Sequence, residues 1–280
     1  MLSYRHAFHA GNHADVLKHY VFSLVLAYMN QKPAPYWVID THAGAGMYVL
    51  DSEFAQKNAE FKYGIARLFV ANRLPNSLQN FVQLINSFNE KKPLHFYPGS
   101  PAIAESFLRK DDKLRLFELH PSDYKLLDEN FSHKNRQIKI EQHDGFAGIK
   151  ACLPPPTKRG VVLIDPPYEL KDDYSRVVDC IKDSLTRFAT GTYLLWYPLL
   201  QRPEPAAMVR DLLALNTDFL QCELTVQAPN FDGYGMHGSG LFIVNPPYIL
   251  PKVLAETMPV LTQLLALDAS ADFSLNHKIS

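Results

Sequence analysis

Short apolar segments alternate with segments of helical character along most of this chain, and this alternation limits the folds that it can adopt. The apolar segments are rich in Val, Ile, Leu and aromatic residues, as expected of buried strands. Alternating strands and helices are typical of a doubly wound sheet with helices on both faces. We therefore predict an α/β fold with seven strands, at residues 36–39, 114–117, 138–141, 161–164, 192–197, 222–227 and 241–244.

The first predicted helix, at residues 12–29, has clear signals at both ends. Apolar residues recur within it at helical spacing, Asn12 is a suitable N-cap, and Asp15 suits the first turn. Pro33 prevents the helix from continuing. Later helices are predicted at residues 173–188 and 205–215.

Two segments depart from the simple alternation. The Gly-rich segment 233–240 predicts a turn, so the last two strands are expected to form an antiparallel hairpin. Residues 47–97 contain helical patterns but no convincing strand, and we interpret them as a small inserted helical subdomain. The main domain is then predicted to consist of residues 1–46 and 98–280.

Composition narrows the functional classes. The 28 basic and 29 acidic residues give a net charge of −1, whereas proteins that coat nucleic acid non-specifically are usually strongly basic. A polynucleotide would therefore be held by a local patch and a pocket. We find no membrane-spanning run and no secretory leader, and Cys152, Cys180 and Cys222 are widely spaced, so we expect a cytoplasmic protein with reduced thiols.

The loop after the first strand, residues 40–46, consists mainly of small residues. Gly44 and Gly46 permit a tight turn that brings backbone N–H groups against a ligand. The loop lacks the G-x-G-x-x-G pattern of dinucleotide-binding proteins. By itself it does not distinguish a methyl-donor site from another ligand site or a structural turn.

Acidic residues end two further strands. Glu118 follows the strand at 114–117, and its carboxylate can accept both ribose hydroxyl hydrogens of an adenosine-containing cofactor. Asp144 follows the strand at 138–141 and could accept a hydrogen bond from the cofactor's adenine amine. Either acid alone could be a solvated loop carboxylate. Their recurrence at one sheet edge, where ligands of open α/β sheets bind, favours the cofactor site.

The segment Asp165-Pro166-Pro167-Tyr168 follows the fourth strand of the main domain. Its two prolines restrict the backbone and remove two N–H donors. The Asp165 carboxylate and the Pro166 carbonyl can both accept hydrogens from one exocyclic amine, which frees the nitrogen lone pair to attack a methylsulfonium. Tyr168 can supply an aromatic face for a base, a contact worth roughly 1–3 kcal/mol. The segment predicts methylation of adenine N6.

A second segment, Asn245-Pro246-Pro247-Tyr248, offers similar groups. It follows the last predicted strand, whereas Asp165 occupies the fourth-strand position. We therefore interpret Asn245 as part of a structural turn.

These motifs together resemble the bacterial 23S rRNA (adenine(2030)-N(6))-methyltransferase family, RlmJ, over essentially the whole chain. The resemblance implies a Rossmann-like class I methyltransferase fold: a seven-stranded, mostly parallel sheet with an antiparallel last strand and a helical subdomain inserted after the first strand. Its most specific stretches are residues 1–6, 8–19, 40–46, 98–101, 118–124 and 165–168.

The resemblance also implies ligands and site residues. S-adenosyl-L-methionine is the implied methyl donor, and 23S rRNA, as free or precursor RNA, is the implied partner of a monomeric enzyme. The implied catalytic residues are Asp165, Pro166 and Tyr168, and the implied substrate contacts are Tyr4, His6, Lys18 and Tyr168. The implied cofactor contacts are His19, His42, Ser100, Glu118, Asp144, Gly145 and Asp165.

Five of the eleven histidines lie in the first 42 residues, which raises the alternative of a metal site. Their spacing does not match a zinc pattern, and methyl transfer needs no metal. We predict ordinary hydrogen-bonding histidines and no metal.

Three other functions remain open at this point. A DNA N6-adenine methyltransferase would share every catalytic residue, and product analysis distinguishes it. A nicotinamide-dependent oxidoreductase would use the same sheet edge but needs the absent dinucleotide pattern. A catalytically silent RNA-binding protein would have no need of the Asp165 segment.

Overall fold

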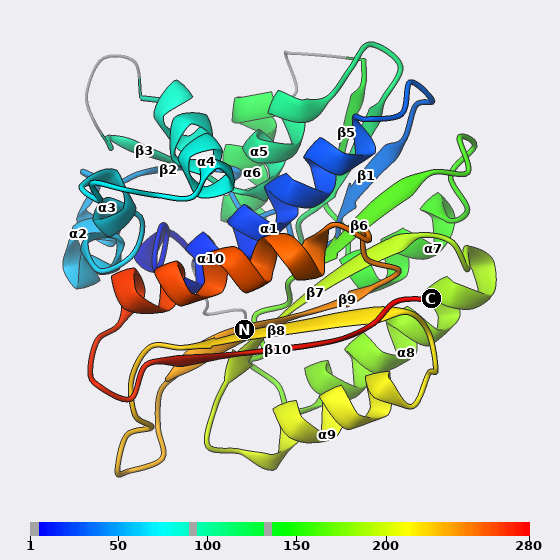
Figure 1. Ribbon diagram of the computed structural model, residues 1–280. Coiled ribbons are helices and arrows are strands. Elements are labelled where there is room, and N and C mark those ends of the chain that lie inside the picture. Colours follow the sequence, from blue (N-terminus) through cyan, green and yellow to red (C-terminus); the bar gives the residue numbers. More distant parts are fainter. Residues whose placement is uncertain (1–5, 90–93, 132–135) are drawn as a thin grey trace.

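The computed structural model describes residues 6–89, 94–131 and 136–280 and contains a large central sheet (Figure 1). Its strand order is β10-β8-β9-β7-β6-β1-β4-β5. The five strands from β5 to β7 are parallel, β9 is antiparallel to both of its neighbours, and β10 is antiparallel to β8. The strands are β1 (Trp37–Asp40), β4 (Lys113–Phe117), β5 (Ile138–Glu141), β6 (Gly160–Ile164), β7 (Thr192–Leu199), β8 (Phe219–Thr225), β9 (Gly238–Val244) and β10 (Asp272–Lys278).

This architecture confirms the predicted Rossmann-like α/β class and adds one strand. The prediction missed β10 because an edge strand pairs on one side only and β10 is largely exposed, so its apolar pattern is weak. The predicted turn at 233–240 was also too long, since β9 already begins at Gly238.

Helices cover both faces of the sheet, as predicted. Successive strand residues point to opposite faces, so Val38 belongs to one hydrophobic core and Ile39 to the other. The first core includes residues of α1 (His13–Met29), α5 (Ser100–Phe107), α6 (Pro121–Phe131) and α10 (Leu250–Leu265). The second includes residues of α7 (Gly145–Cys152), α8 (Asp172–Arg187) and α9 (Pro203–Leu213).

Helix α1 crosses the middle of the first face and begins as predicted (Figure 1). The Asn12 side chain accepts hydrogen bonds from the backbone N–H groups of Ala14 and Asp15, each at 3.0 Å. The helix is buried on nearly all sides, so Asp15, Lys18 and His19 are buried together with its apolar residues. Buried charges require partners, and they direct attention to this end of the helix.

The segment 47–97 begins and ends in strands, which corrects the prediction that it contains none. β2 (Met47–Val49) and β3 (Phe96–Pro98) form a two-stranded antiparallel sheet, and strands this short show no periodicity in the sequence. Between them lie α2 (Glu53–Asn58), the 3-10 helix η2 (Glu60–Lys62), α3 (Ile65–Phe69) and α4 (Asn76–Ser87); another 3-10 helix, η1 (His6–Phe8), precedes α1. Phe81 of α4 packs edge-on against Tyr20 of α1 with ring centroids 5.7 Å apart. The segment thus shares the first core, and its status as a subdomain stays a prediction.

None of the helices in the described part of the chain has the length and apolar character needed to span a lipid bilayer.

Strand β9 is antiparallel to β7 and ends beside the start of β7. Asn245, which follows β9, therefore lies at the other end of the strands from Asp165. Its side-chain N–H groups donate to the carbonyls of Ala189 and Gly191, both at 2.8 Å. Asn245 itself has φ of 51°, a left-handed conformation that Asn tolerates better than most residues. These contacts confirm the interpretation as a structural turn.

We predict that Asn245→Ala lowers the free energy of unfolding by about 1–2 kcal/mol, because two carbonyls lose their donor, and leaves methyl transfer unchanged. Urea denaturation and turnover measurements check the two halves. A variant that is stable but inactive would contradict the assignment of this turn.

Candidate active site

A cavity of about 480 Å³ opens where the carboxyl ends of β1, β4, β5 and β6 meet the start of α1. This volume lies within the usual range for small-molecule sites, roughly 300–1,000 Å³. Tyr4 lies outside the described residues. Every other site residue predicted from the sequence lines the cavity: His6, Lys18, His19, His42, Ser100, Glu118, Asp144, Gly145, Asp165, Pro166 and Tyr168.

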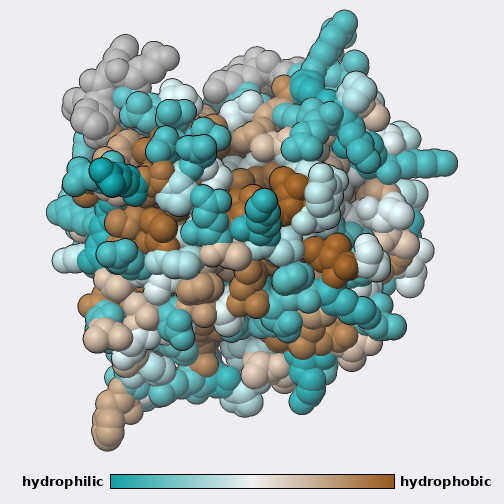
Figure 2. Space-filling model, viewed as in Figure 1, coloured by the Kyte–Doolittle hydropathy of each residue, from teal (hydrophilic) through white to brown (hydrophobic). Residues whose placement is uncertain are grey.

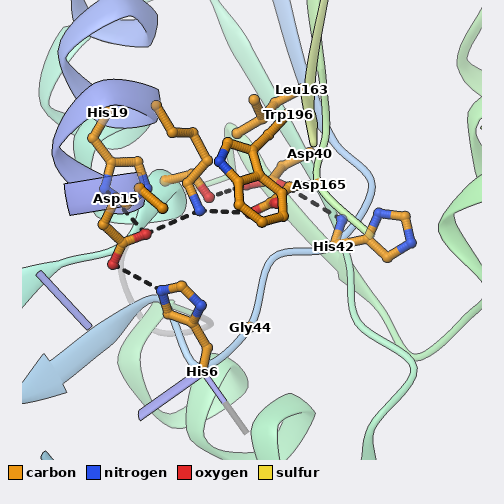
Figure 3. Close-up of polar contacts among 12 residues, drawn as sticks. His6, Asp15, His19, Asp40, His42, Gly44, Leu163, Asp165 and Trp196 are labelled. Atoms are coloured by element: carbon orange, nitrogen blue, oxygen red, sulfur yellow. Dashed lines mark hydrogen bonds and ion pairs between the residues drawn. The ribbon is translucent and has the colours of Figure 1, made fainter. Parts of the chain in front are cut away.

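Lys18 joins two carboxylates inside this cavity. Its Nζ lies 2.5 Å from Asp165 Oδ2 and 3.0 Å from Asp15 Oδ1. Asp15 Oδ2 in turn contacts His6 Nε2 and accepts from the backbone N–H of Gly11, both at 2.9 Å (Figure 3). One buried network therefore links the segment before α1 to the end of β6.

The pKa of Asp15 follows from these neighbours. Burial by itself raises the pKa, but the charges of His6 and Lys18 outweigh it and hold the pKa well below the ordinary value. Asp15 is therefore an anion, and Lys18 lies between two acids. Removing one member of a buried ion pair typically costs about 3–5 kcal/mol, so the network fixes the position of Lys18.

Tyr168 turns back into the protein directly after the two prolines. Its φ is 52°, its hydroxyl donates to the Trp196 carbonyl at 2.8 Å, and its ring lies 4.6 Å from that of Tyr174. Only 7% of Tyr168 is exposed. The hydroxyl thus has a packing role, and the part of the ring that reaches the cavity is what could contact a base.

Trp196 is a cavity residue that the sequence analysis missed. In strand β7 only Trp196 and the last residue, Leu199, are partly exposed, and the Trp196 ring lies 6.1 Å from that of Tyr168. The Lys18 ammonium lies 5.9 Å from the indole centroid. Trp196 lies on the strand next to β6, level with Asp165. Its aromatic character was the available signal, but the sequence does not give the strand order and register that bring it beside Asp165.

Glu118 is held in place by the loop after β1. Its Oε2 accepts from the backbone N–H of Gly44 at 2.8 Å, and its Oε1 accepts from that of His120 at 2.6 Å. Burial raises the pKa of Glu118, and the two backbone hydrogen bonds oppose that rise. Gly44 has φ of 57°, so the turn that presents its N–H favours glycine.

Asp144 and Gly145 serve the structure of helix α7 as well as the cavity. Asp144 caps the helix by accepting from the backbone N–H of Phe146 at 2.9 Å, and it pairs with Arg176 at 2.6 Å. A Cβ on Gly145 would lie 1.9 Å from the Thr41 carbonyl oxygen, so only glycine lets α7 approach the loop this closely. Arg176, on α8, was not predicted.

The two predicted cofactor histidines are neutral. Burial lowers the pKa of His19 well below its ordinary value and that of His42 to about 4. His19 Nδ1 lies 2.9 Å from the Tyr97 hydroxyl, and among the described residues its buried Nε2 has no hydrogen-bond partner. His42 Nδ1 lies 2.8 Å from the Thr41 hydroxyl. Within residues 6–89, 94–131 and 136–280, no three His, Cys, Asp or Glu side chains are grouped as metal ligands.

Asp40, at the end of β1, is a fully buried acid that was not among the predicted site residues. Its Oδ2 accepts from the Ser100 hydroxyl at 2.6 Å, and its Oδ1 accepts from the backbone N–H of His42 at 3.2 Å. Burial raises its pKa from 3.8 to about 7 despite these hydrogen bonds. Its position at a strand end, like that of Glu118, was a signal that could have identified it.

The raised pKa of Asp40 predicts a pH dependence of stability. Between pH 3.8 and about pH 7 the carboxyl is mostly ionised in the unfolded chain but mostly protonated in the folded protein. The free energy of unfolding therefore falls as the pH rises through this range. Each pKa unit corresponds to about 1.4 kcal/mol. Asp40→Asn removes the titrating group. We therefore expect the free energy of unfolding of Asp40→Asn, relative to that of the native protein, to increase by a few kcal/mol between about pH 4 and pH 8.

Urea denaturation of the ligand-free protein at both pH values measures this difference. Asp211→Asn, at an exposed acid, is the matched control and is expected to show little change. If the free energies of unfolding of Asp40→Asn and the native protein differ by the same amount at both pH values, the assigned pKa is wrong.

The chain is similar to known proteins over nearly its whole length. The family model described as "Ribosomal RNA large subunit methyltransferase D, RlmJ" matches residues 33–276. The chain is 48% identical over 260 residues to ribosomal RNA large subunit methyltransferase J of Escherichia coli (strain K12), with 92% of each chain covered. It is 44% identical over 277 residues to the protein of that name from Haemophilus influenzae, with 98% of each covered. The crystal structure of protein LPL1258 from Legionella pneumophila superposes with a TM-score of 0.89 at 34% identity, covering 96% of this chain and 98% of that one.

Proposed function

The chain belongs to the RlmJ family of ribosomal RNA large subunit methyltransferases, and we propose that it transfers a methyl group from S-adenosyl-L-methionine to N6 of an adenine in 23S rRNA. The observation that carries this proposal is the Lys18–Asp165 ion pair beside Pro166 in the cavity. The pair holds the Asp165 carboxylate beside the Pro166 carbonyl, so that both oxygens could accept hydrogens from one exocyclic amine.

The charge of the cavity supports this methyl donor. Lys18 and Arg176 are its only lysine or arginine among the described residues, against seven acids: Asp15, Glu118, Asp123, Asp144, Asp165, Glu169 and Asp173. An acidic cavity favours a ligand with net positive charge and disfavours a pyrophosphate. S-adenosyl-L-methionine carries a sulfonium and an ammonium against one carboxylate, whereas a nicotinamide dinucleotide carries a pyrophosphate. The oxidoreductase alternative is therefore disfavoured.

The residues around the cavity offer contacts to each part of the donor. Glu118 would accept from the ribose hydroxyls and Asp144 from the adenine amine, while the Gly44 loop would lie against the ligand. His19, His42, Ser100 and Gly145 complete the proposed contacts. When bound, the donor supplies a methyl group made electrophilic by the adjacent sulfonium.

Asp165 and Pro166 would act on the target amine. Lys18 contacts Asp165 Oδ2, which leaves Oδ1, among the described contacts, to accept one amine hydrogen. The Pro166 carbonyl would accept the other, so the nitrogen lone pair is less delocalised into the ring. The amine loses one proton in the reaction, and Asp165 Oδ1 would receive it. The Lys18 ammonium, in contact with Oδ2, holds the Asp165 carboxylate in position.

The target adenine has to be unpaired or flipped out of a helix, because N6 within a duplex cannot reach this cavity. Extrusion costs a few kcal/mol and less in a loop or bulge. We propose that the enzyme acts on free or precursor rRNA and not on the finished ribosome. His6, tied to Asp15, and Tyr4, which precedes it, are proposed to contact the base on the substrate side. We further propose that the enzyme acts as a monomer in the cytoplasm.

Asp165→Ala is expected to abolish N6-methyladenosine formation while the protein stays folded, because Lys18 keeps its pair with Asp15. The measurement is digestion and product analysis after incubation with labelled donor and either 23S rRNA transcripts or DNA. Asn245→Ala, in the second Pro-Pro-Tyr segment, is the matched control. Turnover of Asp165→Ala within about tenfold of the native protein would overturn the site, since general acid–base groups typically contribute roughly 100-fold or more. Methylation of DNA alone would overturn the substrate.

Glu118→Ala is expected to weaken binding of the methyl donor by about ten- to a hundredfold, because a charge-assisted acceptor is worth roughly 1.5–3 kcal/mol. Calorimetric titration with S-adenosyl-L-methionine measures the change. Glu129→Ala on the surface of α6 serves as a control. Equal donor affinity in the native protein and Glu118→Ala would exclude Glu118 from the donor site.

A further inference from the structure

The connection between β8 and β9 carries two exposed aromatic residues and also contributes a residue to the wall of the cavity. Phe231 is fully exposed and Tyr234 is 70% exposed, whereas Met236 in the same connection lines the cavity. Figure 1 shows the connection extending beyond the sheet at the lower left, and Figure 2 shows apolar atoms at the tip of this projection. We call residues 227–237 the β8–β9 loop.

The loop is anchored at the sheet edge that carries the active site. The backbone N–H of His237 donates to the carbonyl of Leu199, the last residue of β7, at 3.1 Å. β7 is parallel to β6, so its end lies at the same edge as Asp165. Leu200, the next residue, lines the cavity. The loop therefore borders the cavity in which the target adenine is proposed to bind.

The tip of the loop is an internally hydrogen-bonded turn. The Asn230 side chain donates to the Tyr234 carbonyl at 2.7 Å, and the Tyr234 N–H donates to Asp232 Oδ1 at 3.0 Å. Gly233 and Gly235 have φ of 75° and 88°, conformations that glycine permits. The turn thus presents its aromatic side chains from an ordered backbone, which reduces the entropy lost when they bind a ligand.

The composition of the loop indicates how it would bind. Residues 227–237 contain no Lys or Arg and one acid, Asp232, so the loop cannot hold phosphates through charge. Aromatic faces remain, and unpaired bases stack on such faces with little regard to sequence. Two separate protruding rings suit individual bases better than they suit the contiguous apolar patch of a protein interface.

We propose that Phe231 and Tyr234 form a stacking platform for unpaired nucleotides that flank the target adenine. This inference rests on the proposed function and adds to it the surface that receives the neighbouring RNA. It also explains how an enzyme with net charge −1 and an acidic cavity holds a polyanion: bases contribute much of the contact.

The test compares the native protein with the double variant Phe231→Ala/Tyr234→Ala on a 23S rRNA fragment that contains the target adenine and its flanking nucleotides. The Kd for RNA and the KM are expected to rise roughly five- to a hundredfold, with kcat and donor affinity nearly unchanged. Stacking releases no counterions, so the ratio of the two Kd values is expected to be the same at about 50 and 200 mM salt.

Five single variants identify the cause of the effect. Phe231→Tyr and Tyr234→Phe keep the rings and are expected to bind like the native protein. Phe231→Leu keeps apolar character without a ring and is expected to bind as weakly as Phe231→Ala. Tyr248→Ala removes an equally exposed aromatic residue near Asn245, at the opposite sheet edge, and is the matched control with native affinity.

Native RNA affinity in the double variant, or native affinity in Phe231→Leu, would overturn the stacking platform. A protein or membrane contact at the loop would give that result. The proposed function fails in a different way, namely if the native protein forms no N6-methyladenosine in the RNA fragment. RNA affinity is measured independently of turnover, so the two failures are distinguishable.

Discussion

The rest of the active site depends on one buried lysine held between two carboxylates. Lys18 Nζ contacts Asp15 on its own helix and Asp165 at the end of β6. Desolvating each of these charges costs several kcal/mol, and close opposite charges and hydrogen bonds have to offset that cost. The position of helix α1 relative to the sheet is therefore coupled to the position of the Asp165 carboxylate. Asp15 extends the coupling to His6, and thereby to the segment proposed to contact the substrate.

The acidic sheet edge suits one ligand and opposes another. Strand β6 is followed by Asp165 and β4 by Glu118, so negative charge gathers where the parallel strands end. Burial raises the pKa of Asp40 to about 7, so this acid is only partly ionised at neutral pH. The negative charge buried at the sheet edge is smaller as a result. Such a cavity favours a cationic methyl donor but repels the phosphates of RNA. Contacts to RNA that do not depend on charge, such as stacking on the β8–β9 loop, are consistent with this division.

Close backbone approaches give the proposed donor side of the cavity its geometry. Gly145 lets helix α7 rest against the Thr41 carbonyl, and Gly44 turns its N–H toward Glu118. Several polar groups near the cavity have structural partners as well as a proposed ligand role. Ser100 holds Asp40, and Asp144 caps α7 and pairs with Arg176. Ligand contacts of these groups would therefore add to an arrangement that already exists in the protein.

The sequence by itself determined the sheet class, the N-cap at Asn12, and the acids and the Asp165-Pro166-Pro167-Tyr168 segment at strand ends. These features depend on periodicity, capping and turn chemistry, which act over a few neighbouring residues. The tertiary structure alone decided that Lys18 meets Asp165, 147 positions away, that Trp196 and Arg176 line the cavity, and that the β8–β9 loop borders it. It also added β2, β3 and β10, which are too short or too exposed to give a periodic signal. Such contacts depend on strand order and on which side chains share a face, and no local pattern encodes either.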